Sequence, residues 1–162
     1  MASFAFDEIE PGLFLGPCPS SPEAVAALAE RGITQLLSLQ TDTDLRGMGL
    51  SWSLLWGFLM RYGINPVRVE IVDFNDASLQ RNLHEAVGSL HMLRRMQQPI
   101  YVHCSVGIHR SSTVVVAYLM ACRGMTREAA LALVHARRPQ VQPNANALDG
   151  WIAEGGPQRI RL

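Results

Sequence analysis

Lysine is absent from this chain of 162 residues, so all of its 14 basic residues are arginine, and 14 acidic residues balance them. The formal net charge at pH 7 is therefore +0. A chain without a charge excess offers no basic field that would hold nucleic acid or an anionic membrane, so we predict neither as a partner.

Cysteine is scarce and irregularly spaced, with only Cys18, Cys104 and Cys122. An odd number of cysteines at such spacing predicts neither a disulfide framework nor a zinc site. His84 and His91 lie seven positions apart with Glu85 nearby, but no third ligand follows at a useful spacing, so we expect no metal.

Long apolar runs are also missing, since none approaches the 18 residues that a membrane span needs. The first residues carry Asp7, Glu8 and Glu10 in place of a basic region. We therefore expect neither a membrane-spanning helix nor a secretory signal peptide.

The composition is that of a globular chain, with 48% hydrophobic and 17% charged residues. The length suits one domain over residues 1–162. Strands and helices are predicted to alternate along the chain. The predicted strands are two within residues 4–16, joined by a turn, and one each at 33–39, 67–72 and 100–103. The predicted helices lie at 20–32, within 40–63, and at 79–97, 114–122, 126–135 and 144–152. This order predicts an α/β domain with a central, mainly parallel sheet flanked by helices.

One stretch, residues 101–112, combines the end of a buried strand with a small-residue loop and the start of a helix. Backbone N–H groups without partners and the positive end of the helix dipole make such a loop an anion site. Gly107 suits it, because glycine tolerates unusual backbone angles and lets an oxyanion approach.

The two ends of this loop carry complementary chemical groups. A thiol at Cys104, facing free amides, a helix N-terminus and a guanidinium, is expected to ionise near neutral pH. Arg110 can hold two oxygens of a phosphoryl group with its planar fork. Ser111 can donate a hydrogen bond to the sulfur and make it a better leaving group.

The pattern His103-Cys104-x-x-Gly107-x-x-Arg110-Ser111 resembles the signature of the cysteine-dependent protein tyrosine and dual-specificity phosphatases. The resemblance implies their fold, a nucleophilic Cys104, no cofactor, and a Ser111 that assists breakdown of the phosphoenzyme. His103 would restrain the loop by hydrogen bonding. Phosphate would be bound by six consecutive residues: Ser105, Val106, Gly107, Ile108, His109 and Arg110. The alternative is a buried structural cysteine beside a capping loop, with Arg110 as a surface charge.

Cleavage of a phosphomonoester also needs a proton donor, and two aspartates compete for this role. Asp73 follows the strand predicted at 67–72, where the family places its general acid, and we favour it. Asp76 suits the cap of the next helix better, together with Ser78.

The segment Leu39-Gln-Thr-Asp-Thr-Asp-Leu45 resembles the corresponding segment of phosphoglucan phosphatases of the laforin and plant starch-phosphatase kind. The aromatic Phe74 next to Asp73 is a second point of resemblance to them. Phe74, His109, Trp52 and Asn144 are thus candidates for the substrate rim. Core packing is the simpler interpretation for Trp52 and Trp56, and burial is an equal alternative for Phe74. Val106 and His109 depart from the phosphoglucan pattern. Because many protein-directed relatives also differ at His109, the choice of substrate stays open. The first hypothesis is a dual-specificity protein phosphatase with a phosphoprotein substrate, and the alternative is a phosphoglucan phosphatase.

Two further hypotheses come from other classes. One is a catalytically inactive module that binds phosphoproteins, and the other is a rhodanese-like sulfurtransferase, which also uses a cysteine loop. A thiolate nucleophile favours the reducing cytoplasm. Cys18 or Cys122 would pair with an oxidised Cys104 only if it lies close by. We interpret Arg137 and Arg138 as a solvated face at a helix end, and the oligomeric state is not predicted.

Overall fold

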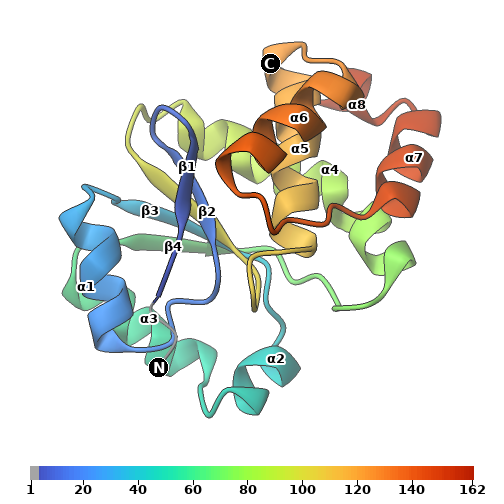
Figure 1. Cartoon of the computed structure of the whole chain (residues 1–162). Coiled ribbons are helices and arrows are strands. Elements are labelled where there is room, and N and C mark those ends of the chain that lie inside the picture. The colour runs from blue at the N-terminus through green and yellow to red at the C-terminus, as the bar shows by residue number, and fades with distance from the viewer. Residues whose placement is uncertain (1–3) are drawn as a thin grey trace.

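The computed structural model describes residues 4–162 and centres on a five-stranded sheet in the order β1-β2-β5-β3-β4. The strands are β1 (Asp7–Glu10), β2 (Leu13–Gly16), β3 (Gln35–Ser38), β4 (Asn65–Arg68) and β5 (Ile100–His103). All neighbours pair in parallel except β1 and β2, which form an antiparallel pair at one edge. This arrangement confirms the predicted α/β fold with a mainly parallel sheet (Figure 1).

Helices cover both faces of the sheet (Figure 1). On one side lie α1 (Pro22–Glu30) and α3 (Trp52–Arg61), with the short α2 (Asp42–Gly47) beyond the strand ends. The other side carries α4 (Asp76–Arg94), α5 (Arg110–Arg123), α6 (Arg127–Arg137), α7 (Ala145–Ala153) and α8 (Gly156–Arg159). Among residues 4–162, no helix is both long and apolar enough to cross a membrane.

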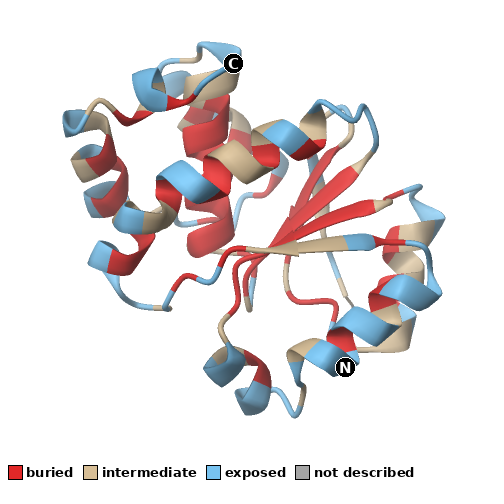
Figure 2. Cartoon of the chain, turned by 180° about the vertical axis from the view of Figure 1, so that it is seen from behind, coloured by how far each residue is buried: buried red, intermediate tan, exposed pale blue. Residues whose placement is uncertain are grey.

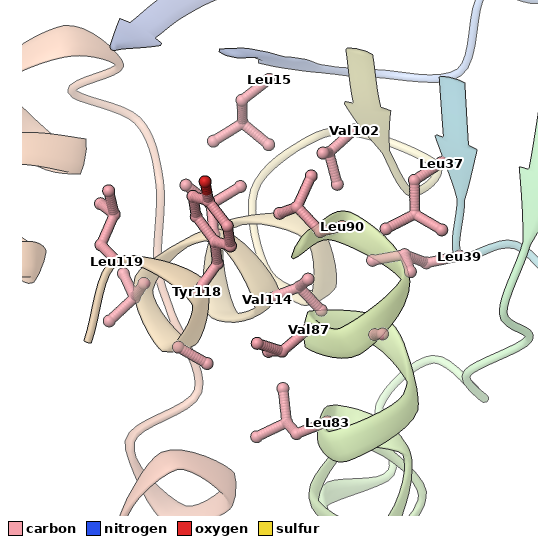
Figure 3. Close-up of a cluster of buried hydrophobic side chains, with 14 of the residues drawn as sticks. Leu15, Leu37, Leu39, Leu83, Val87, Leu90, Val102, Val114, Tyr118 and Leu119 are labelled. Atoms are coloured by element: carbon pink, nitrogen blue, oxygen red, sulfur yellow. The ribbon is translucent and has the colours of Figure 1, made fainter. Parts of the chain in front are cut away.

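Alternation along the strands divides the core into two layers, because successive side chains point to opposite faces of a sheet. Leu15, Leu37 and Val102 pack against α4 and α5 in the larger cluster (Figure 3). Their neighbours Phe14, Leu36 and Tyr101 pack against α1 and α3 in the smaller one. The three inner strands β2, β5 and β3 are therefore buried on both faces, whereas the edge strands β1 and β4 are partly exposed and each outer helix leaves one face exposed (Figure 2).

Local capping signals place most helix ends where the sequence predicts them. Ser21 caps α1 and Thr126 caps α6, each side chain accepting a backbone N–H three residues on. Gly124 ends α5 with a φ of 66°, as expected for a glycine just after a helix.

Four details differ from the prediction. The fourth strand is Asn65–Arg68 and not 67–72, because β4 is an edge strand whose Pro66 costs no ladder bond on the open side. Helix α5 already begins at Arg110, and α2 and α8 were not predicted. The cap of α4 is Asn75, so Asp76 is the first residue of that helix.

Candidate active site

The loop between β5 and α5 occupies the middle of the sheet edge. β5 is the central strand of five, and its carboxyl end leads through residues 104–109 to the N-terminus of α5 at Arg110. His109, the residue before α5, makes no capping hydrogen bond with its side chain. The first turn of this helix therefore keeps its N–H groups available.

Within residues 4–162, none of the backbone amides of Ser105 to His109 donates a hydrogen bond to another protein group. The carbonyl groups of the same loop are occupied. Cys18 donates to the Ser105 oxygen at 3.0 Å, Arg138 Nε donates to the Gly107 oxygen at 2.9 Å, and Gln142 donates to the Ile108 oxygen at 2.9 Å. The loop thus has its acceptors satisfied from outside and its donors free, which is the arrangement of an anion-binding nest.

Gly107 is the residue on which this loop shape depends. Its φ is +70°, and a Cβ there would lie 2.4 Å from the carbonyl carbon of Gly16. No other residue fits without moving the end of β2.

Cys104 lies at the bottom of the loop with 2% of its surface exposed. Its Sγ lies 3.1 Å from Oγ of Ser111, in the first turn of α5. His103 is fully buried, stacks on Tyr101, and has its Nδ1 2.9 Å from the carbonyl oxygen of Cys104. A carbonyl only accepts, so Nδ1 carries the proton and donates. Burial, the largest cause, lowers the pKa of His103 to about 4, so the ring is neutral at physiological pH.

The side chain of Arg110 is 3% exposed, and its guanidinium contacts the loop at Ser105 and three residues outside the loop. Nη1 donates to Oδ2 of Asp44 at 2.7 Å and to the carbonyl of Ile71 at 2.8 Å. Nη2 lies 3.2 Å from Oγ of Ser105 and 3.2 Å from Oδ2 of Asp73. The arginine is therefore a buried, anchored cation and not a surface charge.

The structure places the carboxylates of Asp73 and Asp76 in different surroundings. Asp73 is five residues beyond the end of β4, on a segment that runs over the loop, and contacts Arg110. Asp76 instead accepts hydrogen bonds from Asn144, which caps α7, and from Asn146, which lies in the first turn of α7. These two bonds lower the pKa of Asp76. Of these two aspartates, Asp73 is therefore the one whose carboxylate contacts Arg110.

The sequence profile of the dual specificity phosphatase catalytic domain matches residues 13–153, which is most of the chain. This chain belongs to the dual specificity phosphatase family. Dual specificity protein phosphatase 1 of Arabidopsis thaliana is 43% identical over 48% of this chain and 39% of its own length. Phosphoglucan phosphatase DSP4 of Castanea sativa is 31% identical over 74% of this chain and 32% of its own length.

Solved structures are similar over nearly the whole length. The human tyrosine phosphatase-like serine/threonine/tyrosine-interacting protein superposes with a TM-score of 0.75 at 26% identity, covering 93% of this chain and 95% of that one. The chain spans only about a third of the length of the first curated relatives, 39%, 32% and 35% for the first three.

The end of the phosphatase loop, at His109 and Arg110, lines a cavity of about 400 Å³ together with the Asp73 segment and Asn144. Phe74 is 90% exposed at its edge, and its ring centroid lies 6.1 Å from that of His109. Asn144 mainly caps α7 and contacts Asp76. Three of the four rim candidates therefore line the phosphatase cavity.

Trp52, the fourth rim candidate, does not line this cavity. It lies in the first turn of α3, and Cζ of the Arg68 guanidinium is 4.8 Å from the centroid of the Trp52 ring. Together with Asp42 and Arg46 it lines a separate cavity of about 410 Å³. Trp56, on the same helix, is 47% exposed.

Two residues that sequence reasoning did not select support the phosphatase loop. Arg138 is 3% exposed and binds the carbonyls of Val106 and Gly107 as well as the carboxylate of Asp7, so its interpretation as part of a solvated face was wrong. Asp44 holds Arg110, and the pair Thr41-x-x-Asp44 forms a capping box that could have revealed α2. Arg138 has no comparable local signal, because its partners lie about 30 residues or more away in sequence.

All three cysteines are free thiols in the structure. Burial is the largest cause that raises the pKa of Cys18 to about 12, and that of Cys122 to about 11. Both are therefore protonated at neutral pH and unreactive compared with a thiolate.

Proposed function

We propose that this domain hydrolyses phosphomonoesters through a phosphocysteine intermediate formed on Cys104. The observation that carries the proposal is the phosphate loop itself. Its amides from Ser105 to His109 are free, its carbonyls are bound from outside, and its two ends present a sulfur and a guanidinium. This arrangement can hold three phosphoryl oxygens while the sulfur attacks the phosphorus.

In the first step, the Cys104 thiolate forms a bond to phosphorus and the bond to the leaving oxygen breaks. The loop amides and Arg110 stabilise the equatorial oxygens as charge spreads over them. Asp73 gives its proton to the leaving oxygen, since an alkoxide or phenolate is a poor leaving group. No metal or cofactor takes part in this scheme.

In the second step, water attacks the phosphocysteine and sulfur leaves. Asp73, now a carboxylate, takes a proton from the water. Ser111, 3.1 Å from the sulfur, donates a hydrogen bond that stabilises the departing thiolate. His103 contributes by fixing the carbonyl of Cys104, which keeps the strand end and the loop in register.

A phosphorylated protein is the first substrate class, as for the relatives named dual specificity protein phosphatases. A phosphorylated glucan is the second, and one observation favours it. Phe74 has φ +53°, uncommon for an aromatic residue, and presents its ring almost fully to solvent beside His109. An exposed ring at the mouth of a phosphate site can stack on a sugar, and relatives named phosphoglucan phosphatases are among those that match.

We also propose a reducing compartment for this protein. A thiolate-dependent enzyme with three free cysteines is suited to a reducing compartment such as the cytoplasm.

Phosphate release tests the proposal directly. Wild type and Cys104→Ser are compared without metal on p-nitrophenyl phosphate, a phosphotyrosine peptide and phosphorylated amylopectin. The proposal predicts release by the wild type and none by the variant, and the preferred macromolecular substrate decides between protein and glucan. Binding of the peptide without release from any substrate would instead identify an inactive phosphoprotein-binding module, and persulfide on Cys104 after exposure to thiosulfate would identify a sulfurtransferase.

A further inference from the structure

The guanidinium of Arg110 is anchored through Nη1, whereas its Nε–Nη2 edge is less completely hydrogen-bonded. Nη1 is fully used by Asp44 and by the carbonyl of Ile71. Nε is buried and has no hydrogen-bond partner among the described residues, and Nη2 makes only two contacts, each at 3.2 Å. A buried donor without a partner is costly, so the Nε–Nη2 edge is the part of the arginine that is left for two phosphoryl oxygens.

Asp44 is itself held rigidly by the start of α2. Its Oδ2 accepts the backbone N–H of Thr41 at 2.9 Å, and its own N–H donates to Oγ1 of Thr41 at 3.2 Å. The same Oδ2 receives Nη1 of Arg110, so one oxygen joins the helix cap to the phosphate loop. Partial burial raises the pKa of Asp44, but the hydrogen bonds from Arg110 and Thr41 outweigh it and the pKa is lowered. The carboxylate is therefore charged at neutral pH.

A second link runs in parallel from the same segment. Gln40 is completely buried, and its Nε2 donates to Oγ of Ser105 at 3.0 Å. The backbone carbonyl of Gln40 accepts a hydrogen bond in turn from Nε of Arg68 at 3.0 Å. The segment from Gln40 to Asp44 thus contacts the phosphate loop at Ser105 and at Arg110, without touching the nucleophile.

We propose that Asp44 is a positioning residue that turns the Nε–Nη2 edge of Arg110 toward the phosphoryl group. This inference rests on the proposed function of Arg110 in binding phosphate. Without Asp44, Nη1 loses its only charged partner and the guanidinium is free to rotate toward the carboxylate of Asp73, which already lies 3.2 Å from Nη2. The arginine would then be neutralised by the acid and turned away from substrate.

The test measures how tightly the site holds inorganic phosphate. The competitive inhibition constant of phosphate, together with KM and kcat for p-nitrophenyl phosphate, is determined for wild type, Asp44→Ala, Asp44→Asn and Asp42→Asn. Asp42 is the matched control, since it lies on the same helix, has a 63% exposed side chain and pairs with Arg68. An inhibition constant does not depend on the fraction of active enzyme, so a variant that is only partly folded would lower kcat without changing it.

The expected inhibition constant rises about tenfold or more in Asp44→Ala, which is the scale of one lost charge-assisted hydrogen bond. Asp44→Asn should show a smaller rise, because an amide oxygen still accepts, and Asp42→Asn should stay within about twofold of wild type. KM should rise along with the inhibition constant, as expected for lost phosphate binding.

An inhibition constant unchanged in Asp44→Ala would overturn the inference, and so would a lower one, which would mean that Asp44 competes with phosphate for Arg110. Failure of the proposed function looks different, because wild type would then release no phosphate from any substrate. Titration calorimetry of inorganic phosphate into wild type and Asp44→Ala compares the binding without turnover, and equal affinities there would again overturn the role of Asp44.

Discussion

The carboxylate of Asp73 lies 3.2 Å from Nη2 of Arg110, so the proposed proton donor is paired with the proposed phosphate ligand before substrate arrives. The next residue, Phe74, is held at a φ of +53°, with its amide donating to Oδ1 of Asp73 at 3.0 Å. We expect the oxygens of an incoming phosphoryl group to displace this contact at Arg110. The acid is then free to face the leaving oxygen.

Replacing Asp73 by alanine should lower kcat by on the order of a hundredfold or more on a phosphotyrosine or phosphoserine peptide, because the leaving oxygen then departs without a proton. The loss should be smaller with p-nitrophenyl phosphate, whose phenolate leaves readily. Steady-state rates over this series of leaving groups check the prediction.

Asp76→Asn is the control for this series, since Asp76 is the competing carboxylate and contacts Asn144 and Asn146 instead of Arg110. The rates of Asp76→Asn should stay within about threefold of wild type for every leaving group. This change is much smaller than the loss of rate expected when a general acid is removed. A strong, leaving-group-dependent loss in Asp76→Asn together with a mild one in Asp73→Ala would reverse the assignment.

Gly107→Ala should destabilise the domain by about 3 kcal/mol or more and abolish turnover. The new Cβ would meet the backbone of Gly16 at 2.4 Å, in addition to the strain of a φ of +70°. Gly32→Ala is the matched control, with a φ of +78° but no atom within 4 Å of the added carbon, and should cost only about 1 kcal/mol. Urea unfolding of the two variants measures the difference, and equal losses would mean that the close approach to β2 does not matter.

Most of the phosphatase loop could be predicted because its signals are local. The strand, Gly107, Cys104 and Arg110 lie within about ten residues, so the residue types that the loop needs stand next to one another in the sequence. The helix caps at Ser21 and Thr126 and the glycine after α5 are determined in the same way.

The supporting contacts could not be found in this way, because they join segments that are distant in sequence. Asp44 and Arg110 are 66 positions apart, and Arg138 reaches Gly107 across 31. A buried arginine at a helix end has the same sequence neighbourhood as a solvated one, and only the folded chain distinguishes Arg138 from Arg137. The shift of β4 has a similar origin, since the alternation over 67–72 continues beyond the residues that pair with β3.

Arg138→Ala should lower the free energy of unfolding by about 3 kcal/mol, because it leaves the carbonyl of Gly107 without its donor and Asp7 without its cation. Its neighbour Arg137, exposed at the end of α6, gives the comparison, since Arg137→Ala should change stability by no more than about 0.5 kcal/mol. Chemical denaturation measures the free energy of unfolding of both variants and so distinguishes an arginine that holds the loop from one that is only a surface charge. Equal stability of the two would contradict the role of Arg138.

The buried ring of His103 should make stability depend on pH. Its pKa is lowered by burial from 6.5 to about 4, so between these values the unfolded chain binds a proton that the folded one does not. The free energy of unfolding should therefore fall as the pH drops from about 6.5 toward 4, by up to about 1.4 kcal/mol per pH unit from this group, with no contribution above that window.

His103→Asn removes this contribution while keeping a donor for the carbonyl of Cys104, and denaturation at several pH values should show a shallower slope than wild type below pH 6.5. His84→Asn, on the exposed side of α4, controls for the loss of a histidine as such. A slope that changes equally in the two variants would show that burial of His103 is not the cause.

In the proposed reaction phosphate passes through the sulfur of Cys104, and mass spectrometry of acid-quenched enzyme detects such an intermediate. Wild type is mixed rapidly with p-nitrophenyl phosphate, quenched before the first turnover is complete, digested and searched for a phosphorylated peptide. The account predicts a phosphate on the peptide that contains Cys104, and no phosphorylated peptide in Cys104→Ser. Turnover by the wild type without any phosphate on Cys104, or continued turnover by Cys104→Ser, would contradict it.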